Sequence, residues 1–151
     1  MIQRKQTLFL FQLVFLGIAL LFIPSATVVS NNVTSPVFLV PVKSAEFASS
    51  AGHIAAIGIN FLALVLTFIT VFMYKRRELQ LKMAFVLIFI WVVLTLMLAF
   101  CPFISATDEV TSVHTNYLPV IIGVVGIIAA YLVAKYIKKD IELIKSADRI
   151  R

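Results

Sequence analysis

Two histidines and one cysteine are the residues of this chain whose side chains could bind a metal ion or a haem. His53, Cys101 and His114 each lie within a few residues of the end of an apolar segment. Imidazole and thiolate are ligands of transition metals and haem iron. No two of the three form a motif with ligand spacing, and a histidine there also serves as a polar end group among headgroups. We predict no metal site and no cofactor, and leave a ligand role of His53 and His114 open.

Side chains for acid-base catalysis or proton transfer are absent from the apolar segments. An ionisable group inside a membrane is costly and usually functional. The polar residues within these segments are all neutral: they are Gln12, Asn60, Thr67, Thr70 and Thr95. The sequence also contains no phosphate-binding glycine-rich loop, nucleophile elbow or zinc motif. We therefore expect no catalytic residues and no enzymatic activity.

Small and polar residues recur at helical spacing in two of the apolar segments. Small side chains let helix backbones approach closely, and a single Asn or Thr can hydrogen-bond to a neighbouring helix. We predict that these residues form a helix-packing face; a substrate groove lined by Asn60 and the threonines is the alternative. The residues are Ala56, Asn60, Ala63, Thr67 and Thr70 in the second segment and Gly123, Gly126, Ala130 and Ala134 in the fourth.

The amino-acid composition indicates that the segments carrying these residues are helices within a membrane. Of the 151 residues, 62% are hydrophobic and 13% are charged, against about 45 to 50% and about 25% in soluble domains. Four stretches of about 16 to 22 residues lack every charged side chain, as a bilayer core demands. We predict an all-α integral membrane fold, an antiparallel bundle of four transmembrane helices forming a single domain, 1–151. The expected spans are about 6–24, 54–74, 83–104 and 117–136.

The connections between these spans differ in length and composition. The loop of about thirty residues after the first span holds two β-branched runs, 27–30 and 37–42, on either side of Asn31 and Asn32, which allows a small extracytoplasmic β-hairpin. The loop 75–82 is short, so the second and third helices are expected to be antiparallel neighbours. The first span follows Arg4 and Lys5 and also fits a cleaved signal peptide.

The basic residues predict the orientation, because Lys and Arg are retained on the cytoplasmic side during insertion. The loop between the first and second spans holds one basic residue, Lys43. The loop between the third and fourth spans holds no basic residue but two acidic ones, Asp108 and Glu109. The termini and the second loop share the other twelve: Arg4, Lys5, Lys75, Arg76, Arg77, Lys82, Lys135, Lys138, Lys139, Lys145, Arg149 and Arg151. Both termini are therefore expected to be cytoplasmic, and the net charge of +6 needs no nucleic acid to explain it.

The tail 137–151 has helical spacing of apolar and basic residues. Ile137, Ile141 and Ile144 recur along one side, interrupted by Asp140 and Asp148. Three interpretations stay open: a basic helix lying on anionic headgroups, a solvated helix that docks on a partner, or a frayed charged tail.

Three charge-rich segments, 1–8, 74–82 and 138–151, resemble a family of small bacterial membrane proteins known as domain of unknown function 4293, found mainly in Bacteroidetes. The segments read MIQRKQTL, YKRRELQLK and KKDIELIKSADRIR. The family pattern has an acidic residue after Asp140, where this chain has Ile141. The resemblance implies four spans with the first retained and a bacterial inner-membrane location. It implies no activity, cofactor or catalytic residue.

The three segments suggest a working surface on the cytoplasmic side. Arg and Asp side chains from different helices could pair there, or the surface could receive a partner. The candidates are Gln3, Arg4, Arg76, Arg77, Gln80, Asp140, Asp148 and Arg149. We predict an accessory or scaffold protein or a small homo-oligomer that contacts the lipid bilayer, anionic headgroups and a membrane-protein partner or a second copy. The alternative is a small-molecule carrier or lipid- or quinone-binding protein that uses the Asn60 face.

Overall fold

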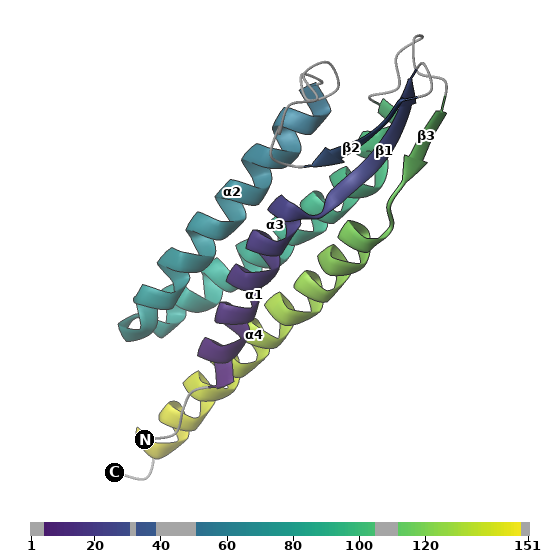
Figure 1. Ribbon diagram of the computed structural model, residues 1–151. Coiled ribbons are helices and arrows are strands. Elements are labelled where there is room, and N and C mark those ends of the chain that lie inside the picture. The colour runs from purple at the N-terminus through teal and green to yellow at the C-terminus, as the bar shows by residue number, and fades with distance from the viewer. Residues whose placement is uncertain (1–4, 31–32, 39–50, 105–111, 149–151) are drawn as a thin grey trace.

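Four helices form an elongated bundle in the computed structural model, which describes residues 5–30, 33–38, 51–104 and 112–148 (Figure 1). The helices are α1 (Lys5–Phe22), α2 (Ala51–Phe72), α3 (Arg77–Ile104) and α4 (Leu118–Asp148). The predicted fold class, an all-α bundle of four helices, is confirmed. The start of α1 and the end of α4 lie at the same end of the bundle, opposite a small sheet.

The helices are arranged as a ring of four. Helix α1 packs on α2 and α4, and α3 packs on the same two helices. Helices α2 and α4 therefore occupy opposite corners of the bundle. A 3₁₀ turn, η1 (Met73–Lys75), joins α2 to α3 and makes them antiparallel neighbours, as the short loop predicts.

Two helices run further into charged sequence than the apolar stretches alone indicate. Helix α3 begins at Arg77 rather than near residue 83, with Glu78 in its first turn, where a negative charge favours a helix start. Helix α4 is continuous through the tail as far as Asp148. The frayed-tail interpretation therefore does not describe residues 137–148. We call the end of the bundle that carries η1, the start of α3 and the tail of α4 the basic end.

A three-stranded antiparallel sheet covers the other end of the bundle. Strands β1 (Pro24–Ser30) and β2 (Val33–Phe38) form the expected hairpin, which pairs Ser30 with Val33. The second strand begins four residues earlier than the predicted run 37–42, of which residues 39–42 lie outside the described part. The sequence analysis missed β3 (Ser112–Thr115), which pairs with the free edge of β1 and gives the order β2-β1-β3.

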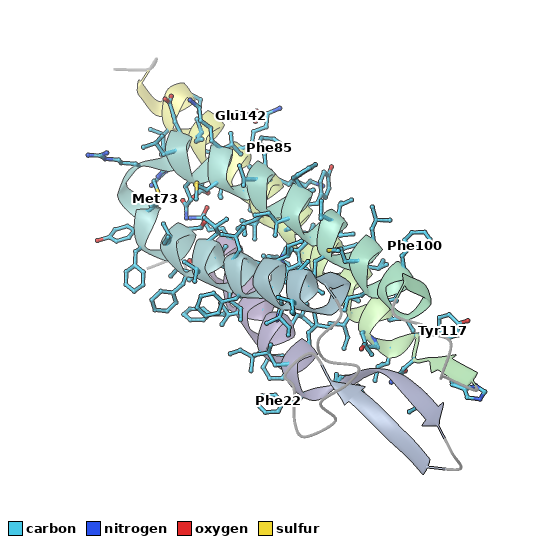
Figure 2. The ribbon with its side chains drawn as sticks, turned by 90° about the horizontal axis from the view of Figure 1, so that it is seen from above. Phe22, Met73, Phe85, Phe100, Tyr117 and Glu142 are labelled. Atoms are coloured by element: carbon cyan, nitrogen blue, oxygen red, sulfur yellow. The ribbon has the colours of Figure 1, made fainter. Side chains whose placement is uncertain are left out.

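Leucine and small residues fill the interior of the bundle, around one indole. Trp91 of α3 is 1% exposed and therefore fills volume in the core. The other buried members of the core cluster include Leu10, Leu13 and Leu20 of α1, Leu87 and Leu94 of α3, and Ala130, Val133 and Ile137 of α4. Most of the phenylalanine side chains that the structure describes are exposed instead, as the labelled Phe22, Phe85 and Phe100 show in Figure 2.

Three of the helices are long and apolar enough to cross a membrane. The segments are Ile54–Phe72, Arg77–Phe100 and Leu118–Ile144, and between 28% and 39% of the most apolar 18-residue window of each is buried within the bundle. The apolar part of α1, Gln6–Phe22, is shorter. Many large apolar side chains of these helices are exposed, among them Phe61, Phe68 and Phe89, which is the distribution that a lipid environment stabilises.

Candidate functional site

Asn60 joins α2 to α1 inside the bundle. Its side chain is fully buried, and Nδ2 donates a hydrogen bond of 3.1 Å to the backbone carbonyl of Gly17. A Cβ at position 17 would lie 2.7 Å from Cδ2 of Leu64, so another residue there would require the Leu64 side chain to move. The sequence analysis identified Asn60 but missed Gly17. A glycine inside an apolar segment was the sequence feature that could have indicated a helix contact there.

The buried threonines of α2 bond within their own helix. The hydroxyl of Thr67 donates to the carbonyl of Ala63, and the hydroxyl of Thr70 donates to the carbonyl of Leu66, each over 2.7 Å. Such bonds to the carbonyl four residues earlier satisfy a hydroxyl without a neighbouring helix. The hydroxyl protons of these two threonines are therefore already used in hydrogen bonds within α2, and they are not free to be donated to a ligand.

Gln80 does not lie on the cytoplasmic surface to which the sequence analysis assigned it. Its side chain is 2% exposed, and Nε2 donates a 3.1 Å hydrogen bond to the carbonyl of Thr70. Carbonyls in the last turn of a helix lack a full set of intrahelical partners. Gln80 is drawn inward because its amide satisfies such a carbonyl at the end of α2.

The glycines of α4 pack against α3. A Cβ at position 126 would lie 2.7 Å from Cδ2 of Trp91, and one at position 123 would lie 3.1 Å from Cβ of Thr95. The Thr95 hydroxyl donates to the carbonyl of Trp91. Glycine is required at both positions because the indole and the threonine occupy the space that a side chain would need.

The two predicted packing faces are buried but do not meet each other. On α2 the buried positions are Ala56, Asn60, Ala63, Thr67 and Thr70, and on α4 they are Gly123, Gly126, Ala130 and Ala134. Because α2 and α4 occupy opposite corners, each face packs on α1 or α3 instead. At the α1–α4 contact, the ring of Phe9 stacks on Tyr136 with centroids 5.6 Å apart.

The proposed charged surface is only partly described. Arg76 is exposed, and Arg77 and Asp140 are half-buried. Among the described residues, no ion pair joins these arginines to Asp140, so the suggested interhelical lock does not form there. Gln3, Arg4 and Arg149, and the side chain of Asp148, lie outside the described part.

Of the three candidate metal ligands, only the side chain of His114 is described. His114 is exposed on β3, whereas the side chains of His53 and Cys101 lie outside the described part. Within residues 5–30, 33–38, 51–104 and 112–148, no group of three or more His, Cys, Asp or Glu residues could hold a metal ion.

Asn116 connects the sheet to the start of α4, a role that the sequence analysis missed. Its Nδ2 donates a 2.9 Å hydrogen bond to the carbonyl of Pro24, and its Oδ1 accepts one of 3.1 Å from the backbone amide of Leu118. An asparagine just before a helix is a common capping residue, which was the available signal.

Comparison with known proteins identifies a family for the chain, and that family has no known function. No curated protein and no solved structure matches it. The sequence model of a family described as Domain of unknown function (DUF4293) matches residues 2–150. This match covers nearly the whole chain and confirms the resemblance in the three charge-rich segments. The chain belongs to the DUF4293 family.

Proposed function

We propose that this protein is a multi-pass protein of the bacterial inner membrane that acts by interaction, as an accessory or scaffold subunit or a small homo-oligomer, without catalysis. The observation that carries this proposal is that the polar side chains of α2 inside the bundle are buried and form hydrogen bonds within the protein. Asn60 is fully buried and donates to the backbone of Gly17, while Thr67 and Thr70 bond to their own helix. A polar face used in this way stabilises a bundle.

The outward apolar surface supports the membrane location. Three helices have the length and hydropathy of membrane spans. Helix α1 has 18 residues and is about 27 Å long, only about 3 Å less than a typical hydrocarbon core. A small deficit of this kind is accommodated by thinning of the bilayer or by flanking side chains that reach the interface.

The packing of α1 supports its retention as part of the bundle. Leu10, Leu13 and Leu20 are buried in the common core, and Gly17 accepts the hydrogen bond of Asn60. Loss of α1 would expose that core surface and remove the acceptor of a buried amide. Both consequences would destabilise the remaining helices.

The distribution of charge supports a cytoplasmic location for the basic end. Arg76, Lys82, Lys135, Lys138 and Lys139 are all exposed there, and α1 begins and α4 ends at this end in Figure 1. Basic residues flanking spans favour the cytoplasmic side. We infer that the two termini are cytoplasmic and that the sheet lies outside the membrane on the opposite side.

A carrier or a lipid- or quinone-binding protein remains the second candidate because Oδ1 of Asn60 has no hydrogen-bond partner among the described residues. Such a protein would have to open α1 away from α2, since Asn60 is 0% exposed. The interaction role needs no such opening, and we favour it for that reason.

Affinity purification from native membranes tests the interaction role. The wild-type chain is compared with a variant carrying Arg76→Gln and Arg77→Gln, and with the control His114→Gln at the opposite end of the bundle. We expect a defined set of co-purifying membrane proteins, or a second copy of the chain, that the double variant loses and the control retains. If the same proteins co-purify with the wild type, the double variant and the control, Arg76 and Arg77 are not part of the interaction surface.

A further inference from the structure

Two buried polar atoms in the middle of α2 and α3 have no hydrogen-bond partner among the described residues. They are Oδ1 of Asn60 on α2 and Nε1 of Trp91 on α3. Asn60 is 0% exposed and Trp91 is 1% exposed. Buried polar groups of native proteins are almost always paired, either with another protein group or with ordered water. Each of these two atoms therefore needs a partner.

The two atoms have complementary hydrogen-bonding roles. The contact with Gly17 fixes the orientation of the Asn60 amide, because a backbone carbonyl only accepts and Nδ2 must therefore face it. This leaves Oδ1 of Asn60 as an acceptor. The indole nitrogen of Trp91 carries a hydrogen and only donates. One acceptor and one donor are therefore left inside the bundle.

The contact between α2 and α3 places Asn60 and Trp91 at nearly the same level. Thr70 lies ten residues after Asn60 on α2, and its carbonyl accepts the hydrogen bond of Gln80 on α3. Trp91 lies eleven residues after Gln80. The two helices are antiparallel, so the steps of about 15 Å and about 16.5 Å run in opposite directions and nearly cancel. Asn60 and Trp91 are therefore within about one turn of each other along the bundle.

The contacts of α1 and α4 lead to the same level. Trp91 packs on Gly126 of α4, and Tyr136, ten residues later, stacks on Phe9 of α1. Gly17, the acceptor of the α2 amide, lies eight residues after Phe9. Helices α1 and α4 run in opposite directions in Figure 1, so the steps of about 15 Å and about 12 Å also nearly cancel. All four helices therefore contribute to one layer of the interior.

Trp91 lies on the side of α3 that also meets α2. Eleven residues separate it from Gln80, which is three helical turns plus about 20°, and Gln80 reaches the end of α2. A Cβ at position 126 would meet Cε3 and Cζ3 of the indole. Nε1 lies on the opposite edge of the ring system and is therefore directed away from α4. Asn60, which is fully buried, faces the same interior from α2.

We propose that one water molecule is bound inside the bundle, where its oxygen accepts a hydrogen bond from Nε1 of Trp91 and donates one to Oδ1 of Asn60. Only a hydroxyl oxygen can both accept and donate, whereas a quinone carbonyl could pair with the indole alone. Water is the smallest molecule with such an oxygen, and it suits a position where neither partner is more than 1% exposed. Buried waters commonly bond polar groups that have no other partner. This water links α2 to α3, as the Gly17 carbonyl links α2 to α1.

Nuclear magnetic resonance of the full chain in detergent micelles tests this site. Trp91 is the only tryptophan of the chain, so labelling with isotope-enriched tryptophan gives a single indole N–H signal. We expect a cross-relaxation peak between this proton and the water resonance, and a rotating-frame experiment separates it from proton exchange. Asn60→Leu, which replaces the amide by an apolar side chain of similar size, should lose the peak. Thr67→Val is the matched control on the same face of α2 and should keep it, because the Thr67 hydroxyl bonds to its own helix.

Three outcomes would overturn the proposal. If the wild type gives no peak with water, no water is bound at the indole, and this result stands even if Asn60→Leu does not fold. Peaks with the carbon-bound protons of a bound organic molecule would show a carried hydroxyl compound in place of water. An unchanged water peak in folded Asn60→Leu would show that Asn60 does not hold the water. None of these results depends on a protein partner, so the water site and the interaction role can fail separately.

Discussion

The side-chain amide of Asn60 on α2 donates a hydrogen bond to the backbone carbonyl of Gly17 on α1, 43 residues earlier in the chain. It is a direct polar link between these helices, made at a glycine whose missing side chain leaves room for Leu64. A hydrogen bond of this kind fixes the rotation and register of two apolar helices, which lipid contacts alone do not distinguish. The helix that fits a signal peptide by sequence is thereby integrated into the fold.

Asn60→Ala should loosen α1 from the bundle. The change removes one interhelical hydrogen bond, which in membrane proteins contributes about 0.6 kcal/mol on average and up to about 1.7 kcal/mol. We expect the free energy of unfolding to fall by about 1 kcal/mol, measured by denaturation in mixed detergent micelles. Thr67→Val is the control, since the Thr67 hydroxyl bonds only to its own helix. A larger loss for Thr67→Val than for Asn60→Ala would contradict the assigned role.

Gly126→Ala should disrupt the α3–α4 contact. A Cβ at this position would lie 2.7 Å from Cδ2 of Trp91, well inside van der Waals contact, and overpacking of this kind costs about 1 to 3 kcal/mol. We expect a lower melting temperature in detergent and partial recovery when Trp91→Leu is added. Gly58→Ala is the matched control because nothing lies within 4 Å of a Cβ there, so its melting temperature should not fall.

Asn116→Ala should weaken the junction between the sheet and α4. It removes the donor to Pro24 and the cap on Leu118, and loss of a helix cap typically costs about 1 kcal/mol. Asn116→Asp keeps the capping oxygen and loses only the donor, so its melting temperature should lie between those of the wild type and Asn116→Ala. The account of this junction fails if the aspartate variant is as unstable as the alanine variant.

Thiol labelling tests the proposed orientation. In a Cys101→Ala background, Ser146→Cys places a thiol at the basic end and His114→Cys places one on the sheet; both positions are exposed. We expect a membrane-impermeant maleimide to label the thiol at position 114 in intact spheroplasts. The thiol at position 146 should react only after permeabilisation. The opposite pattern would reverse the topology.

The number of helices and the buried positions on α2 and α4 followed from the sequence, because charge-free stretches and residues three or four apart are local patterns. The pairing of those helices did not follow. Asn60 meets Gly17 and Gly126 meets Trp91, and such contacts depend on the ring arrangement of the bundle, which no single segment encodes.

The burial of Gln80 and the third strand were missed for related reasons. Gln80 lies in a charged segment, and its polar side chain therefore suggests a surface position. Its burial follows from a contact with the end of α2, because its amide donates a hydrogen bond to the carbonyl of Thr70. Strand β3 has four residues and pairs with β1 where the end of α1 and the start of α4 bring Asn116 beside Pro24. Both features depend on contacts between distant parts of the chain.

Crosslinking with mass spectrometry in native membranes tests the central claim, the interaction role, most directly. An amine-reactive crosslinker would act on the exposed lysines of the basic end, Lys82, Lys135, Lys138 and Lys139. The account predicts reproducible crosslinks from these lysines to one defined membrane protein or to a second copy of the chain. If only crosslinks within a single copy form, while a small molecule co-purifies with the wild type and is lost in Asn60→Ala, the interaction role is contradicted in favour of a carrier.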